Sequence, residues 1–366
     1  MKTGILTFHH AKNYGAVLQT FALQTTLKEM GANPYIIDRY TVGKTIIHRI
    51  YHTFDPRLIL HKLSWVIFDQ FSKKYLIPKT KKYKTINSLK YFEQKEKLDA
   101  CIVGSDQVWR MEFSAIGYNY FFDFIKDSNI RKISYAASFG KEKWKENESV
   151  TTHVKQLLKY FNSISVREKS GVKICSDIFD VNATHVLDPT LLLKREVYES
   201  IFLNDYPKKM NATLVTYVLG NPDAAKYCHK FSKECDLDYV DLYYVPHINK
   251  FFLAKKYGIK HYLHISVPEW LWQIKSAKYV VTNSFHATIF SILFGKQFIV
   301  VDHPSGGTSR IDSLLELLGL QDRFVTNISD ISLELFQKKI DFDSVYSKID
   351  VEKNQSILFL QNALFK

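Results

Sequence analysis

The chain has 366 residues, a length that suits two domains of ordinary size. With 46% hydrophobic and 24% charged residues, it has the composition of a soluble globular protein, which excludes extensive disorder. Its formal charge of +13 favours anionic partners, namely nucleic acid, an anionic lipid surface or phosphorylated small molecules.

No targeting or membrane-spanning segment stands out. The four cysteines are scattered, without the CxxC spacing of a zinc or redox site, which favours a reducing compartment. The apolar run at residues 3–8 is too short for a signal peptide and predicts a buried strand. No window approaches the roughly 18 apolar residues of a membrane helix. We therefore expect a cytoplasmic protein whose membrane contact, if it has one, is peripheral and at the inner face of the cell membrane.

The N-terminal residues predict a strand, a loop, a helix and a second strand. A strand over 3–8 leads into the polar loop 9–15, a helix covers 17–30 and ends at Gly31, and the next strand covers 34–38. This order is a βαβ unit, which implies a parallel sheet.

An aromatic-rich helical stretch covers residues 51–77, and four lysines follow it within residues 79–84. These lysines form either a solvated face or, together with the aromatic stretch, a surface that rests on an anionic membrane. Four short apolar strands complete this half of the chain, at 100–103, 133–137, 163–166 and 184–189.

The second half of the chain repeats the alternation. The expected strands are 212–219, 239–245, 279–282 and 298–301, and the expected helices are 222–235, 285–294 and 311–318. This alternation predicts the α/β class, with two Rossmann-like domains facing a cleft. We place the N-terminal domain at 1–195 and the C-terminal domain at 196–345. The remaining residues, 346–366, contain an amphipathic helix over 357–365 that packs back on one domain.

Polar residues gather in the loops after the predicted strands, where open α/β sheets bind their ligands. After the strand at 279–282, Asn283 or Ser284 is a suitable N-cap, and the free N–H groups of the following helix would bind a carboxylate or phosphate. His286 in the first turn adds a hydrogen-bond donor or a proton. The alternative is that Ser284 only caps the helix and His286 packs in the core.

Two other strand ends carry candidate residues. Arg167 offers bidentate recognition of a carboxylate or phosphate, or else an ion pair with Glu168 or another neighbour. Asp106 follows the strand at 100–103 and would accept a proton from a hydroxyl, while Trp109 would stack on a sugar ring. The alternative is that Asp106 caps a helix and Trp109 fills the core.

Other patterns bear on cofactors. Glycines at 306–307 precede Arg310, which either contacts an anion or belongs to a flexible loop. The first loop lacks the G-x-G-x-x-G of a nicotinamide or flavin enzyme, and neither a Walker loop nor H-E-x-x-H occurs. Two D-x-D spacings occur away from the cleft-side strand ends, at Asp236/Asp238 and Asp341/Asp343. We therefore predict neither a metal nor a redox cofactor.

A series of motifs over residues 3–320 resembles the polysaccharide pyruvyl transferase family. The motifs are 4–9 (GILTFH), 13–19 (NYGAVLQ), 102–109 (IVGSDQVW), 134–140 (SYAASFG), 165–168 (SVRE), 187–190 (LDPT) and 282–288 (TNSFHAT). Each motif alone is weak, but the set in family order is specific.

The resemblance implies a fold similar to that of the GT-B glycosyltransferases. It also implies phosphoenolpyruvate as the donor and a sugar diol as the acceptor, which becomes a pyruvate ketal. Such an enzyme would act in exopolysaccharide or capsule biosynthesis, on a sugar of a polysaccharide or of its lipid-linked oligosaccharide precursor. We expect the reaction to be metal-independent and to need no cofactor, and we expect no nucleic-acid partner.

The family pattern also implies roles for residues. Arg167 and His286 hold the donor, and His286 is the candidate acid. Some relatives have an arginine where this chain has Ser284, and Arg310 is our candidate replacement for that cationic contact. Asp106 or His9 is the candidate base. The other donor-binding candidates are Asn283, Ser284 and Phe285, and the acceptor-binding candidates are Asn13, Tyr14, Gln107 and Trp109.

Two other classes of protein stay open. A GT-B glycosyltransferase would share the fold and the basic cleft but would use a nucleotide sugar. A non-catalytic protein that binds nucleic acid, another anion or a membrane surface would explain the charge without a catalytic site.

Overall fold

The computed structural model describes residues 1–39, 56–113, 117–206, 213–243, 265–302 and 309–366. Four predicted features lie wholly or partly outside these residues: the glycine pair at 306–307, the first residue of the strand expected over 212–219, the end of the strand expected over 239–245, and the start of the helical stretch expected over 51–77.

The N-terminal domain is built on a parallel sheet of six strands, in the order β2-β1-β3-β4-β5-β6. The strands are β1 (Lys2–Leu6), β2 (Asn33–Ile36), β3 (Ala100–Val103), β4 (Arg131–Ala137), β5 (Ser163–Val166) and β6 (Thr184–His185). Each of them overlaps a strand that the sequence predicts. The sheet buries most of β1, β3, β4 and β5, whereas the edge strand β6 is polar and not buried.

The C-terminal domain has a second parallel sheet, of five strands, in the order β11-β10-β9-β7-β8. The strands are β7 (Thr213–Tyr217), β8 (Asp238–Asp241), β9 (Tyr279–Thr282), β10 (Gln297–Val301) and β11 (Phe324–Val325). In each sheet, the second strand in chain order lies on one side of the first strand, and the third strand lies on the other side of it. Each sheet therefore changes direction between its first and third strands, where such folds bind ligands.

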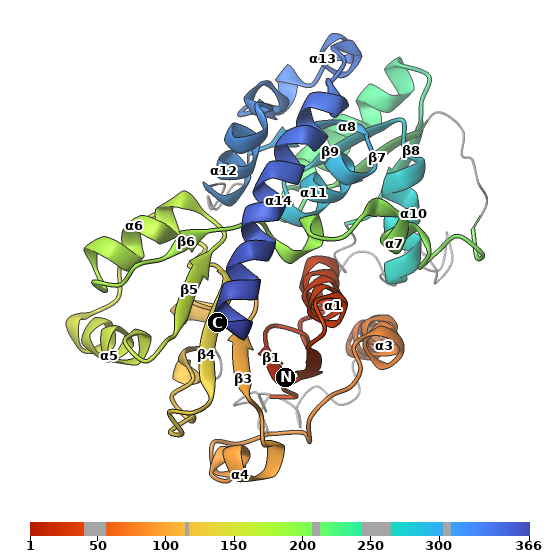
Figure 1. Cartoon of the computed structure of the whole chain (residues 1–366). Coiled ribbons are helices and arrows are strands. Elements are labelled where there is room, and N and C mark those ends of the chain that lie inside the picture. Colours follow the sequence, from red (N-terminus) through yellow and green to blue (C-terminus); the bar gives the residue numbers. More distant parts are fainter. Residues whose placement is uncertain (40–55, 114–116, 207–212, 244–264, 303–308) are drawn as a thin grey trace.

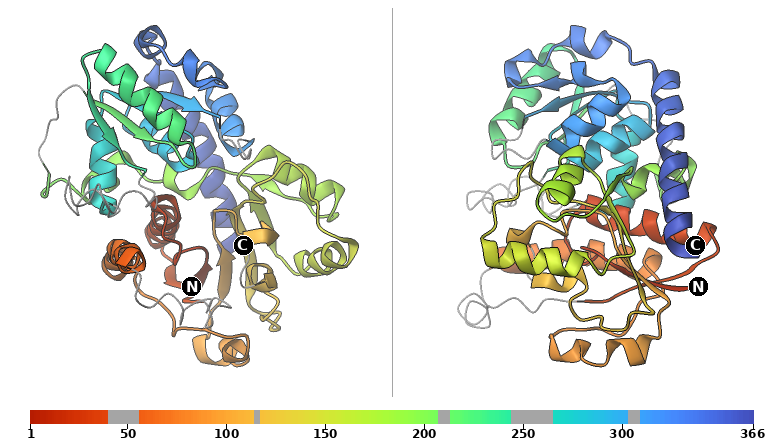
Figure 2. Two further views of the ribbon diagram at one scale, coloured as in Figure 1. Left: turned by 180° about the vertical axis from the view of Figure 1, so that it is seen from behind. Right: turned by 60° about the vertical axis from the view of Figure 1, so that its left-hand side comes forward.

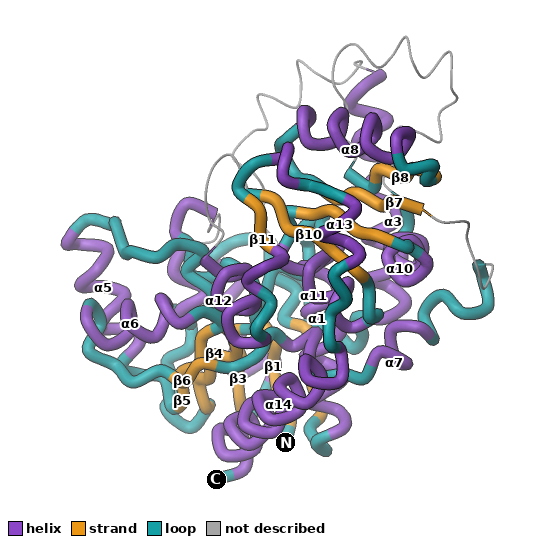
Figure 3. The backbone as a smooth tube through the Cα atoms, turned by 90° about the horizontal axis from the view of Figure 1, so that it is seen from above, coloured by secondary structure: helices purple, strands orange, loops and turns teal. Residues whose placement is uncertain are grey.

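Helices cover both faces of each sheet (Figures 1 and 3). In the N-terminal domain they are α1 (Tyr14–Glu29), α3 (Pro56–Tyr75), α4 (Phe92–Glu96), α5 (Glu148–Leu158) and α6 (Lys169–Asp177), followed by α7 (Arg195–Glu199). In the C-terminal part they are α8 (Pro222–Glu234), α10 (Val267–Ser276), α11 (Phe285–Leu293), α12 (Ser309–Leu318), α13 (Leu333–Gln337) and α14 (Phe342–Phe365). The two α/β domains that the sequence predicts are confirmed.

One hydrophobic core is shared by the two domains. It contains inward residues of both sheets together with residues of α1, α10, α11, α12 and α14. At its centre the Tyr14 ring of α1 stacks on the Trp270 ring of α10, with 5.0 Å between centroids and 10° between planes. The domains are therefore packed together on this side. Separate cores fill the outer faces, under α5 and α6 in one domain and under α8 and α13 in the other.

Helix α14 runs past both domains (Figures 1 and 2). Near its start the Tyr346 hydroxyl donates a hydrogen bond to the Ile292 carbonyl (3.1 Å). Near its end the Ala363 carbonyl accepts one from Arg131 of β4 (3.2 Å). The sequence predicts only its last turns, 357–365, because the preceding residues are rich in charged and polar side chains and bury only a narrow stripe.

The lysines after α3 have two kinds of environment. Lys79 is half-buried and its Nζ donates to the Ser72 hydroxyl (2.6 Å), whereas Lys81, Lys82 and Lys84 are exposed. Among the described helices, none is both long enough and apolar enough to cross a membrane.

Candidate active site

Arg167 and Asp188 form a buried ion pair at the carboxyl end of the first sheet. Arg167 follows β5, and its Nη1 donates to Asp188 Oδ2 (2.7 Å) and to the Ser105 hydroxyl (3.2 Å). The other carboxylate oxygen of Asp188 accepts from the backbone N–H (3.0 Å) and the hydroxyl (2.6 Å) of Thr190. Burial alone would raise the pKa of Asp188, but His286 and Arg167 beside it outweigh burial and hold that pKa well below its usual range.

His286 brings the C-terminal domain to the same carboxylate. It lies in the first turn of α11, and its Nε2 is 3.6 Å from Asp188 Oδ2. On its other side the ring rests on the backbone of Gly15 in α1, where a Cβ would lie only 2.0 Å from Nδ1. The imidazole is therefore held between the first turns of two helices that belong to different domains.

Two guanidinium groups lie near the ring of Phe285. The Arg167 Cζ is 4.4 Å and the Arg310 Cζ 5.9 Å from the centroid of its ring. Burial and the neighbouring Arg167 charge lower the pKa of Arg310 to about 10. Two cations held this close at a buried position favour the binding of an anion.

Buried donors at this position lack partners. Among the residues that the structure describes, Arg167 Nε and Nη2, Arg310 Nε and His286 Nε2 are buried and have no hydrogen-bond partner. Leaving such a group unsatisfied costs about 1–3 kcal/mol. A carboxylate or phosphate between the two arginines and His286 would satisfy them.

The first turn of α11 adds backbone donors. Ser284 occupies the N-cap position, as predicted, but its side chain makes no capping hydrogen bond. Asn283 does not cap either, because its side-chain amide pairs with both backbone groups of Leu219, at 2.7 and 2.8 Å. The first N–H groups of α11 are thus left without a side-chain cap at the positive end of the helix dipole.

Asp106 lies at the edge of the same cluster. Its backbone φ is +85°, its carboxylate accepts from the Gln107 N–H (2.8 Å), and Arg167 Nη2 is 3.8 Å away. It does not cap a helix. Glu168 is not the partner of Arg167, because its Oε1 accepts from the Ser138 hydroxyl and the Phe139 N–H, both at 2.9 Å.

Two predicted acceptor-binding residues lie in hydrophobic cores instead. Trp109 is 0% exposed, stacks on Phe121, and donates its indole N–H to the Tyr120 carbonyl (3.1 Å). Tyr14 is buried at the domain interface, and its hydroxyl donates to the Ile265 carbonyl (2.8 Å). Neither ring has a face open to a sugar, so these two assignments are corrected. A lone aromatic residue in a predicted loop gives the same sequence pattern whether its ring binds a ligand or packs in the core.

Asn13 and Gln107, the other two acceptor candidates, make local contacts. The side-chain oxygen Oδ1 of Asn13 caps α1 by accepting from the Gly15 N–H (2.8 Å). The side-chain oxygen Oε1 of Gln107 accepts from Arg110 Nη1 (2.9 Å), and the Gln107 side chain fills the space beside Gly140.

His9 belongs to a different cluster. Its described hydrogen bonds link Nδ1 to the Thr7 carbonyl (3.1 Å) and Nε2 to Asp38 Oδ1 (3.4 Å), and His10 Nε2 is 2.5 Å from the same oxygen. Burial lowers the pKa of His9 to about 4, so the ring stays neutral near pH 7. His9, His10 and Asp38 are the one group among the described residues whose atoms lie close enough together to hold a metal ion. The structure does not link His9 to Arg167 or His286.

One aspartate of the D-x-D spacings has a structural role: Asp341 caps α14 by accepting from the Ser344 N–H (3.1 Å). Asp238 is the first residue of β8, at the amino end of that strand. Sequence reasoning missed Asp188 and Gly15. Both lie inside the family-like motifs, but only the folded chain shows that they contact Arg167 and His286.

Comparisons with known proteins identify the family and the fold. The family model described as polysaccharide pyruvyl transferase matches residues 13–305. No curated protein matches the sequence. A putative UDP-N-acetylglucosamine 2-epimerase from Listeria monocytogenes is similar in structure, with 11% identity, a TM-score of 0.61, and coverage of 99% of this chain and 96% of that one. The S. aureus MnaA–UDP structure has 13% identity, a TM-score of 0.54, and coverage of 99% and 90%. At these identities the likeness shows the GT-B-like fold alone.

Proposed function

The chain belongs to the polysaccharide pyruvyl transferase family, and on this premise we propose that it transfers the enolpyruvyl unit of phosphoenolpyruvate to a sugar diol, which becomes a pyruvate ketal. The acceptor is a sugar of a polysaccharide or of its lipid-linked precursor. The protein acts in the cytoplasm, with peripheral contact at the membrane where the acceptor is lipid-linked.

The unpartnered donors around Phe285 support this proposal most. Phosphoenolpyruvate carries its carboxylate and its phosphate on the same carbon atom, and each needs several N–H donors. Among the described residues, Arg167, Arg310 and His286 offer buried nitrogen atoms without hydrogen-bond partners, and the uncapped first turn of α11 adds its dipole. In this arrangement Arg167 and Arg310 bind the two anionic groups, and Phe285 spaces the guanidinium groups.

The reaction requires one proton donor and one acceptor. A proton goes to the methylene carbon of the donor while a sugar hydroxyl attacks the neighbouring carbon and loses its own proton. A second hydroxyl then attacks the same carbon, phosphate leaves, and the second hydroxyl proton leaves with it. His286 gives the first proton, and Asp188 stabilises its charged form from 3.6 Å. Asp106, 3.8 Å from Arg167, takes the hydroxyl proton.

His9 is a weaker candidate for the base because its contacts lie with Asp38 and His10. We propose that turnover does not depend on a metal ion, so it should survive exhaustive chelation. Loss of turnover in chelator and its return with a divalent ion would point to His9, His10 and Asp38, which could then be substituted.

Ligand-induced thermal stabilisation tests the proposal directly. At a concentration 100 times its dissociation constant, phosphoenolpyruvate should stabilise the protein by about 2.7 kcal/mol, while UDP-N-acetylglucosamine and an oligonucleotide should not. Arg167→Lys keeps the charge but loses the planar fork, so its stabilisation by phosphoenolpyruvate should be smaller. Arg195→Lys, at an exposed arginine paired with Glu196, is the matched control and should respond as the native protein does.

A thermal shift with the nucleotide sugar and none with phosphoenolpyruvate would reject the proposal in favour of a glycosyltransferase. A shift with the oligonucleotide alone would favour a nucleic-acid binder.

A further inference from the structure

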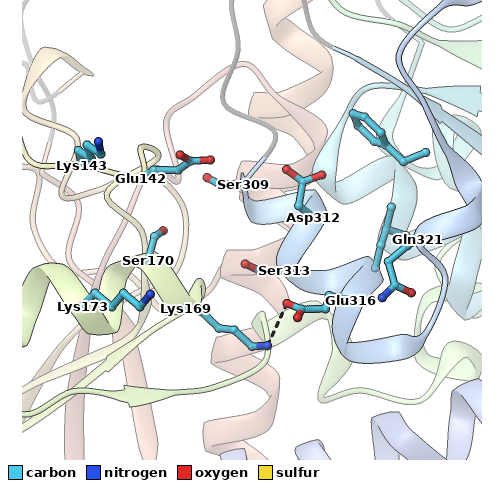
Figure 4. A pocket seen from close by; sticks show the side chains of 12 residues that line it. Glu142, Lys143, Lys169, Ser170, Lys173, Ser309, Asp312, Ser313, Glu316 and Gln321 are labelled. Atoms are coloured by element: carbon cyan, nitrogen blue, oxygen red, sulfur yellow. Dashed lines mark hydrogen bonds and ion pairs between the residues drawn. The ribbon is translucent and has the colours of Figure 1, made fainter.

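A pocket of about 700 Å³ opens between α6 of the N-terminal domain and α12 of the C-terminal domain. Figure 4 shows its two walls: Lys169, Ser170 and Lys173 face Asp312, Ser313 and Glu316. Lys169 and Glu316 form an ion pair across it at 2.9 Å. Because both domains contribute to the pocket, a molecule bound there would contact each of them.

The pocket adjoins the cluster of Arg167, Arg310 and His286, which we call the anion-binding cluster, on both sides of the cleft. Lys169 and Ser170 follow Arg167 closely in sequence, and Ser309 directly precedes Arg310. Ser313 of α12 lines this pocket and also the narrow crevice that contains Arg167 and Arg310. A ligand in the pocket would therefore lie next to a donor held by the two arginines.

The charge of the pocket differs from that of the chain. Among the described residues, its charged lining consists of three lysines (Lys143, Lys169 and Lys173) and three carboxylates (Glu142, Asp312 and Glu316). The formal charges cancel, whereas the whole chain carries +13. Such a lining does not favour a second anion. It offers both donors and acceptors to an uncharged ligand with many hydroxyl groups.

Two lining hydroxyls lack hydrogen-bond partners among the described residues. Ser309 is 8% exposed, and its Oγ and that of Ser170 are both buried without such a partner. Gln321 and the ring of Phe324 lie on the α12 side of the pocket. Polar groups of this kind around a concave, partly apolar wall are typical of small-molecule sites, whose volumes range from about 300 to 1,000 Å³.

We propose that this pocket binds the acceptor as an uncharged pyranose, with Asp312, Ser309 and Ser170 contacting its hydroxyls. This inference rests on the proposed function and replaces the acceptor site predicted around Tyr14 and Trp109. It places the sugar in the pocket, and any phosphate of a lipid-linked acceptor lies outside it.

Saturation-transfer NMR tests this assignment with methyl glycosides of glucose, galactose, mannose and N-acetylmannosamine as probes. Each is measured alone and with inorganic phosphate, which would fill the anion-binding cluster. At least one glycoside should give a signal in the native protein. Asp312→Asn keeps the shape but removes a charged acceptor, so binding should weaken about tenfold or more. Ser309→Ala should weaken it as well.

Asp223→Asn is the matched control, because Asp223 also lies in the first turn of a helix but is exposed in α8, and it should leave the signal unchanged. The inference would be overturned if glycosides bound equally well to the Asp312→Asn and Ser309→Ala variants and to the native protein. It would also be overturned if no glycoside gave a signal with the native protein. Stabilisation by phosphoenolpyruvate is read separately. Its absence would reject the proposed function even if glycosides bind in the pocket, and its presence in Asp312→Asn would show an intact donor site.

Discussion

Phe285 places two like charges on the same aromatic ring. The cost of this arrangement is visible at Arg310, whose pKa burial and Arg167 lower to about 10. Asp188 compensates only one of the two guanidinium groups directly, at 2.7 Å from Arg167. An anion bound between them would relieve the repulsion and satisfy the free N–H groups together.

His286 decides whether this cluster only binds or also catalyses. His286→Gln keeps a polar group of similar length but cannot carry a proton. If His286 protonates the methylene carbon, turnover at saturating phosphoenolpyruvate should fall by about 100-fold to 10,000-fold. Steady-state kinetics measure this, with His229→Gln, an exposed histidine of α8, as the control that keeps native rates. A raised Michaelis constant with near-native turnover would leave His286 as a binding residue.

His9 should make stability depend on pH. Burial lowers its pKa from 6.5 to about 4 in the folded chain, and Asp38, His10 and Lys79 face it. The unfolded chain therefore takes up a proton first as the pH falls. The stabilisation is complete above pH 6.5 and is lost progressively toward pH 4, by about 3 kcal/mol in total.

The thermal midpoint of the native protein should thus fall between pH 7 and pH 5, and that of His9→Gln should fall less. His229→Gln controls for the loss of an exposed histidine and should follow the native protein. Equal slopes in all three proteins would show that His9 is not held neutral by the fold.

Several elements could be predicted closely from the sequence, and others could not. The strands β3, β5 and β9 have the predicted ends, because each is a four-residue run of mostly apolar and small residues followed at once by loop residues. Most of α14 could not be predicted, because a helix that touches two domains along a narrow stripe leaves little apolar periodicity. Its buried positions include Val345, Ile349 and Leu360.

The residues of the site likewise include some that could be located from the sequence and others that could not. Arg167 and His286 lie at strand ends that sequence patterns can locate, and the structure brings them to the same carboxylate. Asp188 lies in the motif 187–190, but that motif does not show what Asp188 contacts, because its partners come from loops far apart in the chain. Trp109 shows the converse, since the loop after β3 turns its ring into the core under Phe121 and Phe139.

The first turns of α1 and α11 meet at Gly15 and His286. Gly15→Ala would place a Cβ 2.0 Å from His286 Nδ1, so the imidazole must move away from Asp188. Turnover should fall and the thermal midpoint should decrease, although alanine favours a helix over glycine by roughly 0.5–1 kcal/mol. In a His286→Ala background the clash is absent, and the same change should leave the midpoint equal or higher. A loss of stability of the same size in both backgrounds would mean that Gly15 is needed for some other reason.

The two domains share one core and the crossing helix α14, so the interface on that side behaves as an interior. A pocket opens between α6 and α12, where the ion pair between Lys169 and Glu316 also lies. Movement between the domains would have to be accommodated by α14 and by the packing of Tyr14 on Trp270.

Leu360 of α14 tests whether this helix holds the domains together. Leu360 is 0% exposed and belongs to the shared core, and nearby Ser356 accepts a hydrogen bond from the Leu187 N–H (3.0 Å), next to Asp188. Leu360→Ala should cost about 2–5 kcal/mol through lost burial and the cavity left behind. Leu358→Ala is the matched control on the same helix, because Leu358 is 53% exposed and its truncation should cost little.

Scanning calorimetry should show a lower midpoint for Leu360→Ala alone, and phosphoenolpyruvate should bind that variant more weakly because the Asp188 loop is less firmly held. Equal melting of the two variants would mean that α14 adds little to the joined domains, and the shared core around Tyr14 and Trp270 would then have to hold them by itself.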